Sequence, residues 1–278
     1  MEPMLVTTEP EVQPTGNLLV RGLTAIVVHR KVPYRVATWT DRMLKAIGSR
    51  FRTVRTRGLE FLVRRGTWAD ESIIRHVVTD REYHPPGYEI GPDDTVIDVG
   101  GNIGAFAVTA CRAAPNGWVI TYEPEPGNAE LLRQNLDRNH CRNVTVVNAA
   151  VSGRGGVLSL HLNPDNSGGH SIHRNHGGPT LTVPAIALRD LFDDHGVERC
   201  DFLKMDCEGA EYDILYSLPR AYYLRIRRIV LEYHGDPKTK RELADGLIRH
   251  LTEMGYRIDR YTDIEGARGG LLYATREE

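Results

Sequence analysis

Cysteine is scarce in this sequence, and its positions do not suggest a metal site. The four cysteines, Cys111, Cys141, Cys200 and Cys207, form no C-x-x-C pair and no other spacing typical of metal ligands. We therefore expect reduced thiols, as in a cytoplasmic protein. The sequence also lacks an apolar run close to the roughly 18 residues that a membrane-spanning helix needs, so we expect no membrane partner.

An excess of one charge is missing as well. The 278 residues include 35 basic and 37 acidic side chains, for a formal net charge of −2. Proteins that bind nucleic acid usually concentrate basic charge, so the composition gives no argument for a nucleic-acid partner. Hydrophobic residues make up 41% of the chain. That share predicts a substantial core, and the length suits one large domain or one domain with an N-terminal addition. Neither specifies an oligomeric state.

The most informative stretch, residues 95–112, has the pattern of a nucleotide-binding βαβ unit. Its first part, up to Val99, is apolar and β-branched, which predicts a buried strand. A turn containing Gly100, Gly101 and Gly104 follows, and the rest predicts a helix. Glycines let the backbone turn sharply beside a ligand. The start of the helix offers free N–H groups to polar ligand atoms.

The glycines of this turn do not have the dinucleotide spacing G-x-G-x-x-G. Asp98, Gly100, Asn102 and Gly104 follow D-x-G-x-N-x-G instead, which resembles motif I of the class I S-adenosylmethionine (SAM) methyltransferases. Glu123 stands at the end of the next expected strand. A carboxylate there can accept hydrogen bonds from both ribose hydroxyls. The stretch predicts an adenosine-containing cofactor, with an ordinary α/β turn and a solvated glutamate as the alternative.

We expect two parts in the chain. Residues 1–65 would form an N-terminal arm with a β/α extension, and residues 66–278 would form the SAM-dependent methyltransferase domain. Within the first part we expect a strand over 18–36, a helix over 40–49 and, from the alternation around a glycine, a hairpin over 51–63.

Helices and strands alternate through the second part. A helix is expected over 68–78, with Asp70 as its N-cap. Beyond the central unit we expect helices over 129–139, 188–195, 209–218 and 238–254, and strands over 120–123, 144–148, 156–162, 200–206, 226–232, 256–261 and 271–274. This order predicts an α/β fold with a mostly parallel sheet, helices on both faces and a hairpin at one edge.

Ligands of such sheets bind outside the carboxyl ends of the strands. The polar residues expected at those ends are Asp98, Glu123, Asn148, Lys204, Asp206, Glu208, Glu232, Tyr233 and His234. Residues 204–211 read K-x-D-x-E-G-x-E. With this stretch the chain resembles the FkbM-type methyltransferases, from about Ala69 to Gly235. The stretches that carry the resemblance also include Tyr83, Asp98–Gly104, Glu123–Pro124, Asn148–Ser152 and Gly168–Ser171.

The resemblance leaves the first 50 residues uncovered and shows two departures. Gly101 stands where alanine is frequent, and Cys207 stands where a β-branched residue is frequent. The family implies a Rossmann-like class I methyltransferase fold with a seven-stranded sheet that contains one antiparallel strand. It also implies SAM as cofactor and, most often, methylation of a hydroxyl oxygen on a sugar, a polyketide or another secondary metabolite.

The resemblance also suggests roles for single residues. Gly100, Asn102 and Gly104 would lie beside the methionine part of SAM, Glu123 would bind the ribose, Asn148 would lie near the adenine, and Tyr83 would close the pocket. The full expected cofactor set is Tyr83, Asp98, Gly100, Gly101, Asn102, Gly104, Glu123, Pro124, Asn148, Ala149 and Asp206.

Methyl transfer to an alcohol needs alignment of the acceptor oxygen and removal of one proton. Our candidates for the base are Asp206, His170 and His234, because an acid at a strand end lies near the cofactor and histidine has a suitable pKa. Lys204 is expected to pair with Asp206 or Glu208 and hold the site. The alternatives are that Lys204 and Glu208 form only a structural ion pair, and that His170 is exposed to solvent.

A Mg²⁺ site could begin with Asp206 and Glu232, but no third acid follows, so the sequence does not favour a metal and we predict no metal ligand. The polar residues 162–179 could form a lid suited to a hydroxyl-rich small-molecule acceptor. Three other functions stay open: an N- or C-methyltransferase, a NAD-dependent oxidoreductase, and a non-catalytic cofactor-binding module. Fold alone does not separate them.

Overall fold

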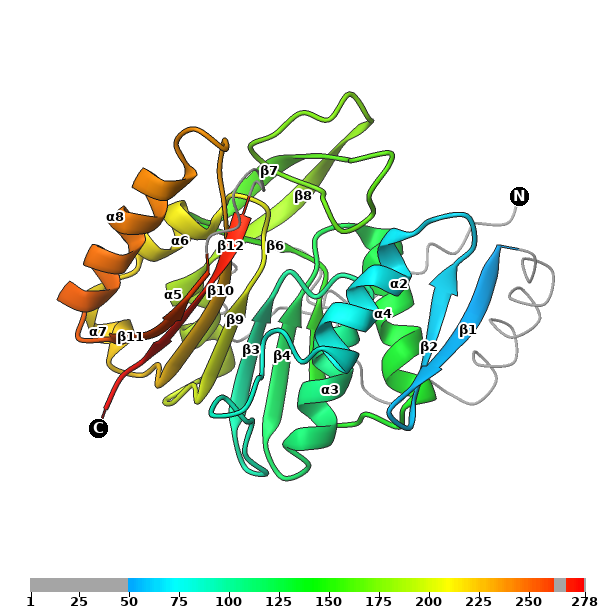
Figure 1. The fold of residues 1–278 in the computed structure, drawn as a ribbon, viewed down its shortest axis with the longest axis horizontal. Coiled ribbons are helices and arrows are strands. Elements are labelled where there is room, and N and C mark those ends of the chain that lie inside the picture. The colour runs from blue at the N-terminus through cyan, green and yellow to red at the C-terminus, as the bar shows by residue number, and fades with distance from the viewer. Residues whose placement is uncertain (1–49, 263–268, 278) are drawn as a thin grey trace, which may run out of the picture.

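The computed structural model describes residues 50–262 and 269–277. The strand expected over 18–36 and the helix expected over 40–49 lie outside these residues. A seven-stranded sheet in the order β11-β12-β10-β9-β3-β4-β5 forms the centre (Figure 1). Its strands are β3 (Thr95–Val99), β4 (Trp118–Tyr122), β5 (Val144–Val147), β9 (Phe202–Met205), β10 (Arg228–His234), β11 (Arg257–Tyr261) and β12 (Gly269–Thr275).

Strand β12 is the antiparallel member of this sheet. It pairs antiparallel with both β10 and β11, whereas β10 with β9, β9 with β3, β3 with β4 and β4 with β5 are parallel pairs. The predicted seven-stranded, mostly parallel sheet with an edge hairpin is therefore confirmed. Among the described residues, no helix is both long enough and apolar enough to cross a membrane.

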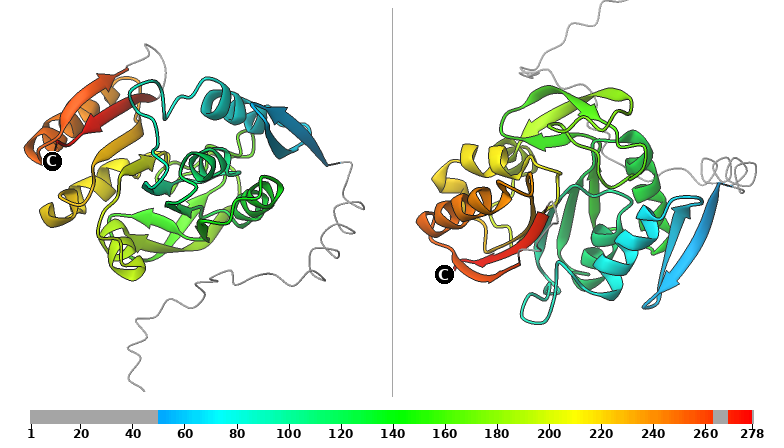
Figure 2. Two further views of the ribbon diagram at one scale, coloured as in Figure 1. Left: turned by 90° about the horizontal axis from the view of Figure 1, so that it is seen from below. Right: turned by 45° about the horizontal axis from the view of Figure 1, so that its top comes forward.

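Helices cover both faces of the sheet, as Figures 1 and 2 show. They are α3 (Ala105–Ala113), α4 (Pro126–Arg138), α5 (Leu188–His195), α6 (Glu211–Ser217), α7 (Arg220–Tyr223) and α8 (Lys240–Glu253). Successive side chains of a strand point to opposite faces. In β3, Ile97 belongs to the core under α5, α6 and α8, whereas Val96 belongs to the core under α3 and α4. Each face therefore has its own apolar core.

The N-terminal hairpin of β1 (Phe51–Thr56) and β2 (Leu59–Arg64) confirms the hairpin expected over 51–63. Gly58 has a φ of 77°, which its turn requires and which glycine adopts without strain. The hairpin lies against α4, where Asn135 Oδ1 accepts a hydrogen bond from the backbone N–H of Leu62 at 2.6 Å. This contact fixes the hairpin to the domain that contains the main sheet.

The next helix corrects one expectation. Helix α2 (Ala69–Ile74) continues as a π-helical turn, η1 (Arg75–Thr79), and Asp70 lies inside its first turn instead of capping it. The Asp70 side chain is buried and accepts hydrogen bonds from the backbone N–H of Arg64 at 2.9 Å and from its guanidinium. The Asp70 carboxylate therefore binds Arg64 of β2 and does not cap the helix, so the expected N-cap is wrong.

A second, three-stranded sheet stands beside the carboxyl ends of the main strands. Its order is β6 (Ala150–Ser152), β8 (Thr180–Ala187) and β7 (Gly156–His161), and only β7 was expected. The segment between β7 and β8 contains the polar residues 162–179. This sheet therefore holds that polar segment above the edge of the main sheet where ligands of α/β folds bind (Figure 2).

Candidate functional site

A cavity of about 340 Å³ lies at the carboxyl ends of β3, β4, β9 and β10. It has the size of a small-ligand site. The expected site residues that line it are Tyr83, Gly100, Gly101, Asn102, Glu123, Pro124, His170, Lys204, Asp206 and Glu208. The expected site residues outside its lining are Asp98, Gly104, Asn148, Ala149 and His234. Two thirds of the expected site residues therefore line this cavity.

The glycine turn lies close to the backbone at the end of the neighbouring strand β9. Gly100 has a φ of 84°, and a Cβ atom there would lie 1.8 Å from the carbonyl oxygen of Asp206. The N–H groups of Gly100 and Gly101 donate to the carbonyl of Tyr122 at 3.0 and 2.9 Å. Gly104, with a φ of 88°, is the N-cap of α3. Only glycine fits at position 100, which leaves backbone at the floor of the cavity.

Glu123 links this turn to the end of β4. Its Oε2 accepts a hydrogen bond from the N–H of Asn102 at 2.8 Å, and its Oε1 accepts one from the N–H of Glu125 at 2.9 Å. Burial raises the pKa of the Glu123 carboxyl to about 7. Asn148 lies behind it and donates its Nδ2 to the carbonyls of Glu123 and Pro124. Asn148 thus positions the acid without lining the cavity.

The partner of Lys204 differs from the expectation. Lys204 Nζ lies 3.1 Å from Asp98 Oδ1 and donates to the carbonyl of Gly100 at 2.7 Å, so the expected pairing with Asp206 or Glu208 is wrong. Lys204 and Asp98 are neighbours in the register of β9 and β3, which brings the two side chains together. Burial would lower the pKa of the ammonium, but the carboxylates of Asp98 and Asp206 together outweigh burial, and the pKa stands above its usual value.

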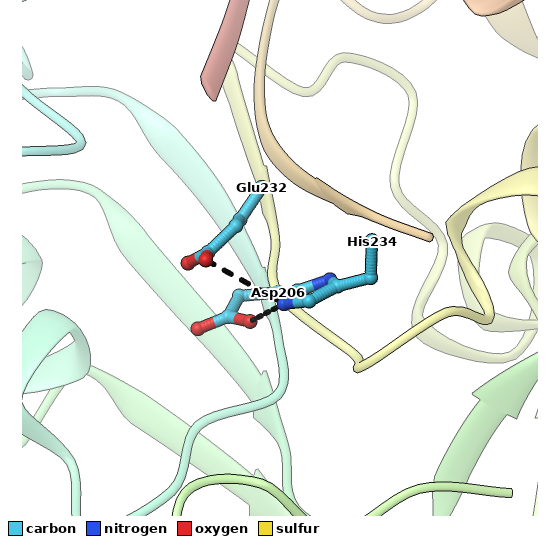
Figure 3. A group of neighbouring side chains, drawn as sticks. All are labelled: Asp206, Glu232 and His234. Atoms are coloured by element: carbon cyan, nitrogen blue, oxygen red, sulfur yellow. Dashed lines mark ion pairs between the residues drawn. The ribbon is translucent and has the colours of Figure 1, made fainter. Parts of the chain in front are cut away.

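Asp206, Glu232 and His234 meet beside the cavity (Figure 3). The hydroxyl of Tyr83 donates to Asp206 Oδ2 at 2.9 Å and to Glu232 Oε2 at 3.3 Å. His234 Nε2 lies 3.5 Å from Glu232 Oε1 and 4.0 Å from Asp206 Oδ1. Its Nδ1 lies 3.1 Å from Oε1 of the fully buried Glu211. Two strand ends and one helix therefore build this cluster.

The protonation states in this cluster follow from burial and neighbouring charge. Burial, with help from Glu232, raises the pKa of Asp206 to about 6. Burial also raises the pKa of Glu232, but His234, Tyr83 and Lys204 together outweigh it, and the pKa of Glu232 falls below its usual value. For His234 itself, burial is outweighed by Glu211, Glu232 and Glu208 together, so its pKa stands well above the ordinary range. The cluster thus contains an imidazolium with Glu211 at one ring nitrogen and three further carboxyl groups within 4.0 Å of the other.

Asp206, Glu232 and His234 are also the residues of this site that could hold a metal ion. They offer three ligand atoms within 4.8 Å of one another. Among the described residues, they are the group of three His, Cys, Asp or Glu side chains close enough together to bind one ion. The sequence suggested Asp206 and Glu232 alone. The third ligand atom comes from an imidazole, and a nitrogen ligand suits transition metals better than Mg²⁺.

His170 is half-buried and lines the cavity, in contrast to the alternative of a solvent-exposed histidine. Its Nδ1 accepts a hydrogen bond from the N–H of Asn163 at 3.0 Å. Burial lowers the pKa of its imidazole. The ring is therefore neutral at neutral pH, and one of its two nitrogens is already engaged.

A second cavity, of about 730 Å³, adjoins the first. Asn166, Glu208 and Glu232 line both cavities, so the two spaces meet at these residues. Among the described residues, Leu271 is the apolar side chain in the lining of the second cavity, and the polar ones are Glu82, Asn163, Asn166, Arg174, Asn175, His176, Glu208, Glu232, His234 and Thr262.

The family model for the methyltransferase FkbM domain matches residues 98–258. The chain belongs to this family. The matched region includes the glycine turn, Glu123 and the whole cluster of Asp206, Glu232 and His234. Membership assigns the chain to the SAM-dependent methyltransferases.

Curated relatives show how far the similarity extends. The 31-O-demethyl-FK506 methyltransferase FkbM of Streptomyces tacrolimicus is 30% identical over 58% of this chain and 74% of its own length. The AMB antimetabolite synthetase AmbE of Pseudomonas aeruginosa is 28% identical over 74% of this chain, which spans 12% of that protein. The 2-O-methyltransferase NoeI of Sinorhizobium fredii is 28% identical over 45% of this chain and 57% of its own length.

A solved structure with a similar chain path is that of fibrillarin from Aeropyrum pernix in complex with SAM. It has a TM-score of 0.49 and 14% identity, and it covers 81% of this chain and 82% of its own.

Two residues of the site were missing from the expected set. Glu82 lines the second cavity, and Oε1 of Glu211 lies 3.1 Å from His234 Nδ1. Glu211 ends the K-x-D-x-E-G-x-E stretch, which is a usable sequence signal. Glu82 precedes the expected Tyr83 but has no such pattern, because its place depends on how the segment between η1 and β3 crosses the site.

Proposed function

We propose that this protein transfers the methyl group of SAM to a hydroxyl oxygen of a polar small-molecule acceptor. The observation that carries the proposal is the meeting of two cavities at a carboxyl cluster. The first has a backbone floor at Gly100 and an acid at Glu123, and the second has polar walls. Two relatives whose names specify O-methylation, the FK506 methyltransferase and the 2-O-methyltransferase NoeI, support the choice of oxygen.

The first cavity fits SAM in this proposal. Gly100, Gly101 and Asn102 of the glycine turn line this cavity, where polar atoms of the cofactor would meet them. The Glu123 carboxylate would accept hydrogen bonds from the ribose hydroxyls. Val151, Leu160 and Ile172 add apolar wall to this cavity, and the adenine would pack against them.

The acceptor would occupy the second cavity and reach the methyl group where the two cavities meet. Carboxylate and amide groups line that space, and they hydrogen-bond well to hydroxyls. An apolar acceptor would leave these groups without partners, which is costly for buried polar atoms. We therefore favour a hydroxyl-rich acceptor.

SAM would supply an activated methyl group on a sulfonium. Asp206 would accept the hydroxyl proton of the acceptor while the oxygen attacks the methyl carbon. A base with a pKa of about 6 is largely ionised at neutral pH and holds a proton better than an ordinary aspartate does. The hydroxyl of Tyr83 donates to Asp206 Oδ2, so the proton of the acceptor would go to Oδ1, which lies 4.0 Å from His234 Nε2.

The other two candidates for the base suit other roles. His234 carries its proton at neutral pH, so it would orient Asp206 and Glu232 through its charge. Nδ1 of His170 already accepts a hydrogen bond from the N–H of Asn163, which leaves Nε2 for other contacts. We therefore assign His170 to the wall of the cavity. Asp206 is therefore the proposed catalytic base.

The test replaces Asp206 by Asn and follows transfer of a deuterated methyl group from SAM to a panel of hydroxylated compounds by mass spectrometry. The variant should keep SAM binding and lose about 10²–10⁴-fold in turnover, because a positioned base contributes that much. Asp245→Asn, at an exposed position of α8, is the matched control and should keep full turnover. Full turnover in Asp206→Asn would refute the assignment, and a methyl group found on nitrogen or carbon would refute O-methylation.

A further inference from the structure

The segment 163–171 closes one side of the first cavity, and Ser167 is its point of attachment. The hydroxyl of Ser167 donates to Asp70 Oδ1 at 2.9 Å. Its carbonyl accepts Nδ2 of Asn102 at 3.1 Å and Nδ2 of Asn128 at 3.0 Å. One residue of the segment is thus joined to α2, to the glycine turn and to α4, which are far apart in sequence.

Asp70 is a fixed anchor for this attachment. Its side chain is 0% exposed, and Arg64 donates to both of its oxygens at 2.9–3.0 Å. Arg64 also donates to Asn128 Oδ1 at 2.8 Å. The carboxylate that receives the Ser167 hydroxyl is therefore held in place on several sides, and hydrogen bonds to a charged partner are the stronger kind.

The two sides joined by Ser167 are adjoining walls of the cavity. Asn166, Ser167 and Gly168 line it from the segment, and Ser72 and Ile73 line it from α2. The walls lie close together, since a Cβ atom added to Gly168 would be 2.9 Å from Cδ1 of Ile73. A ligand in the cavity is covered along this line as long as the segment stays attached.

We propose that Ser167 and Asp70 form a latch that holds the segment 163–171 over the bound cofactor and sets how fast the cofactor leaves. The inference rests on the proposed function only in taking SAM as the ligand of the first cavity. Ser167 and Asp70 are positioning residues in this view. The cofactor is released when the hydroxyl leaves Asp70 and the segment separates from α2.

The latch also has a consequence for the acceptor. Asn163 and Gly169 of the same segment line the second cavity, and Asn166 lines both. A segment held closed over the cofactor therefore completes a wall of the acceptor space. SAM binds first in such an arrangement, and the acceptor space takes its final form afterwards.

The test measures the dissociation rate of radiolabelled SAM during a chase with unlabelled SAM. Ser167→Ala removes the hydroxyl and leaves the two carbonyl contacts. It should raise the dissociation rate about 10-fold, because a hydrogen bond to a charged group is worth that order. Ser167→Thr, which keeps a hydroxyl, should restore most of the retention. Ser159→Ala, at an exposed position of β7, is the matched control and should dissociate at the wild-type rate.

The melting temperature separates a latch from general stabilisation. The latch predicts faster dissociation with a melting temperature close to that of wild type. Equal dissociation rates in wild type and Ser167→Ala would overturn it, and so would an increase that Ser159→Ala shares. If Ser167→Ala fails to fold, hydrogen exchange of wild type replaces it: residues 163–171 should gain protection with SAM, and unchanged exchange would overturn the latch. Wild-type protein that binds no SAM would instead refute the proposed function.

Discussion

Replacing Lys204 by Met tests how the floor of the site is held together. The side chains of Lys204 and Asp98 are 3% and 0% exposed, and their charged atoms lie 3.1 Å apart. Methionine keeps the apolar stem and removes the ammonium. Asp98 would then remain buried with the hydroxyl of Thr121 as its hydrogen-bond partner. Removing one member of a buried ion pair costs about 3–5 kcal/mol, because the other charge stays uncompensated.

A loss of that size is easy to measure. For a domain of about 150–250 residues, each kcal/mol lowers the melting temperature by about 2–4 °C, so we expect a decrease of roughly 6–20 °C by scanning calorimetry without ligand. Lys238→Met, at an exposed position, is the matched control and should change little. In a double-mutant cycle, Asp98→Asn should recover part of the loss in Lys204→Met.

Two results would refute this account of Lys204. One is a melting temperature for Lys204→Met equal to that of Lys238→Met. The other is a stronger coupling of Lys204→Met with Asp206→Asn than with Asp98→Asn, because that result would mean that Asp206 is the partner.

Three further predictions concern Glu123 and the glycine turn. The pKa of Glu123 is about 7, and its ionised form would accept hydrogen bonds from the ribose hydroxyls. Calorimetry should therefore find a SAM affinity about 10-fold lower at pH 6 than at pH 8. An affinity that does not change over this pH range would contradict this. A raised folded pKa means that the native state holds a proton that the unfolded chain releases between pH 4.5 and about 7, so this group lowers stability as pH rises through that window. The free energy of unfolding of Glu123→Gln, measured in urea relative to that of wild type, should therefore increase by about 3 kcal/mol between pH 5 and pH 8. A difference between the two proteins that does not change with pH would contradict this. Gly100→Ala, whose Cβ would lie 1.8 Å from a carbonyl oxygen, should lose SAM binding and melt lower, and normal binding would show that the turn can relax.

The sequence predicted the parts of the fold that local pattern determines. The apolar run before Val99 and the glycines after it form β3 and the turn into α3, because burial and backbone freedom act within a few residues. Glu123 and Asp206 line one cavity because the carboxyl ends of parallel strands share an edge. The missed strands, β6 and β8, belong to a separate small sheet, and β8 contains Pro184, which argues against a strand in sequence.

The errors concern partners that only the register and the packing decide. Lys204 faces Asp98 because β9 and β3 are in register at these residues, and no local pattern reveals that alignment. Asp70 has the composition of an N-cap, but Arg64 from the hairpin engages its carboxylate. A distant residue bears on His234 as well, since Glu211 from α6 raises its pKa, and for this reason we propose Asp206 as the base. In each case a distant charge decides the role of the residue.

Calorimetric titration of the purified protein with SAM, and separately with NAD⁺, tests the central claim most directly. We predict that the wild type binds SAM, that Glu123→Ala does not, and that neither binds NAD⁺. The reason is that the glycine turn and Glu123 follow the SAM-binding pattern of the family and not the dinucleotide pattern. Binding of NAD⁺ without SAM would contradict the account and favour an oxidoreductase. Binding of neither would contradict it too and favour a module without catalytic function.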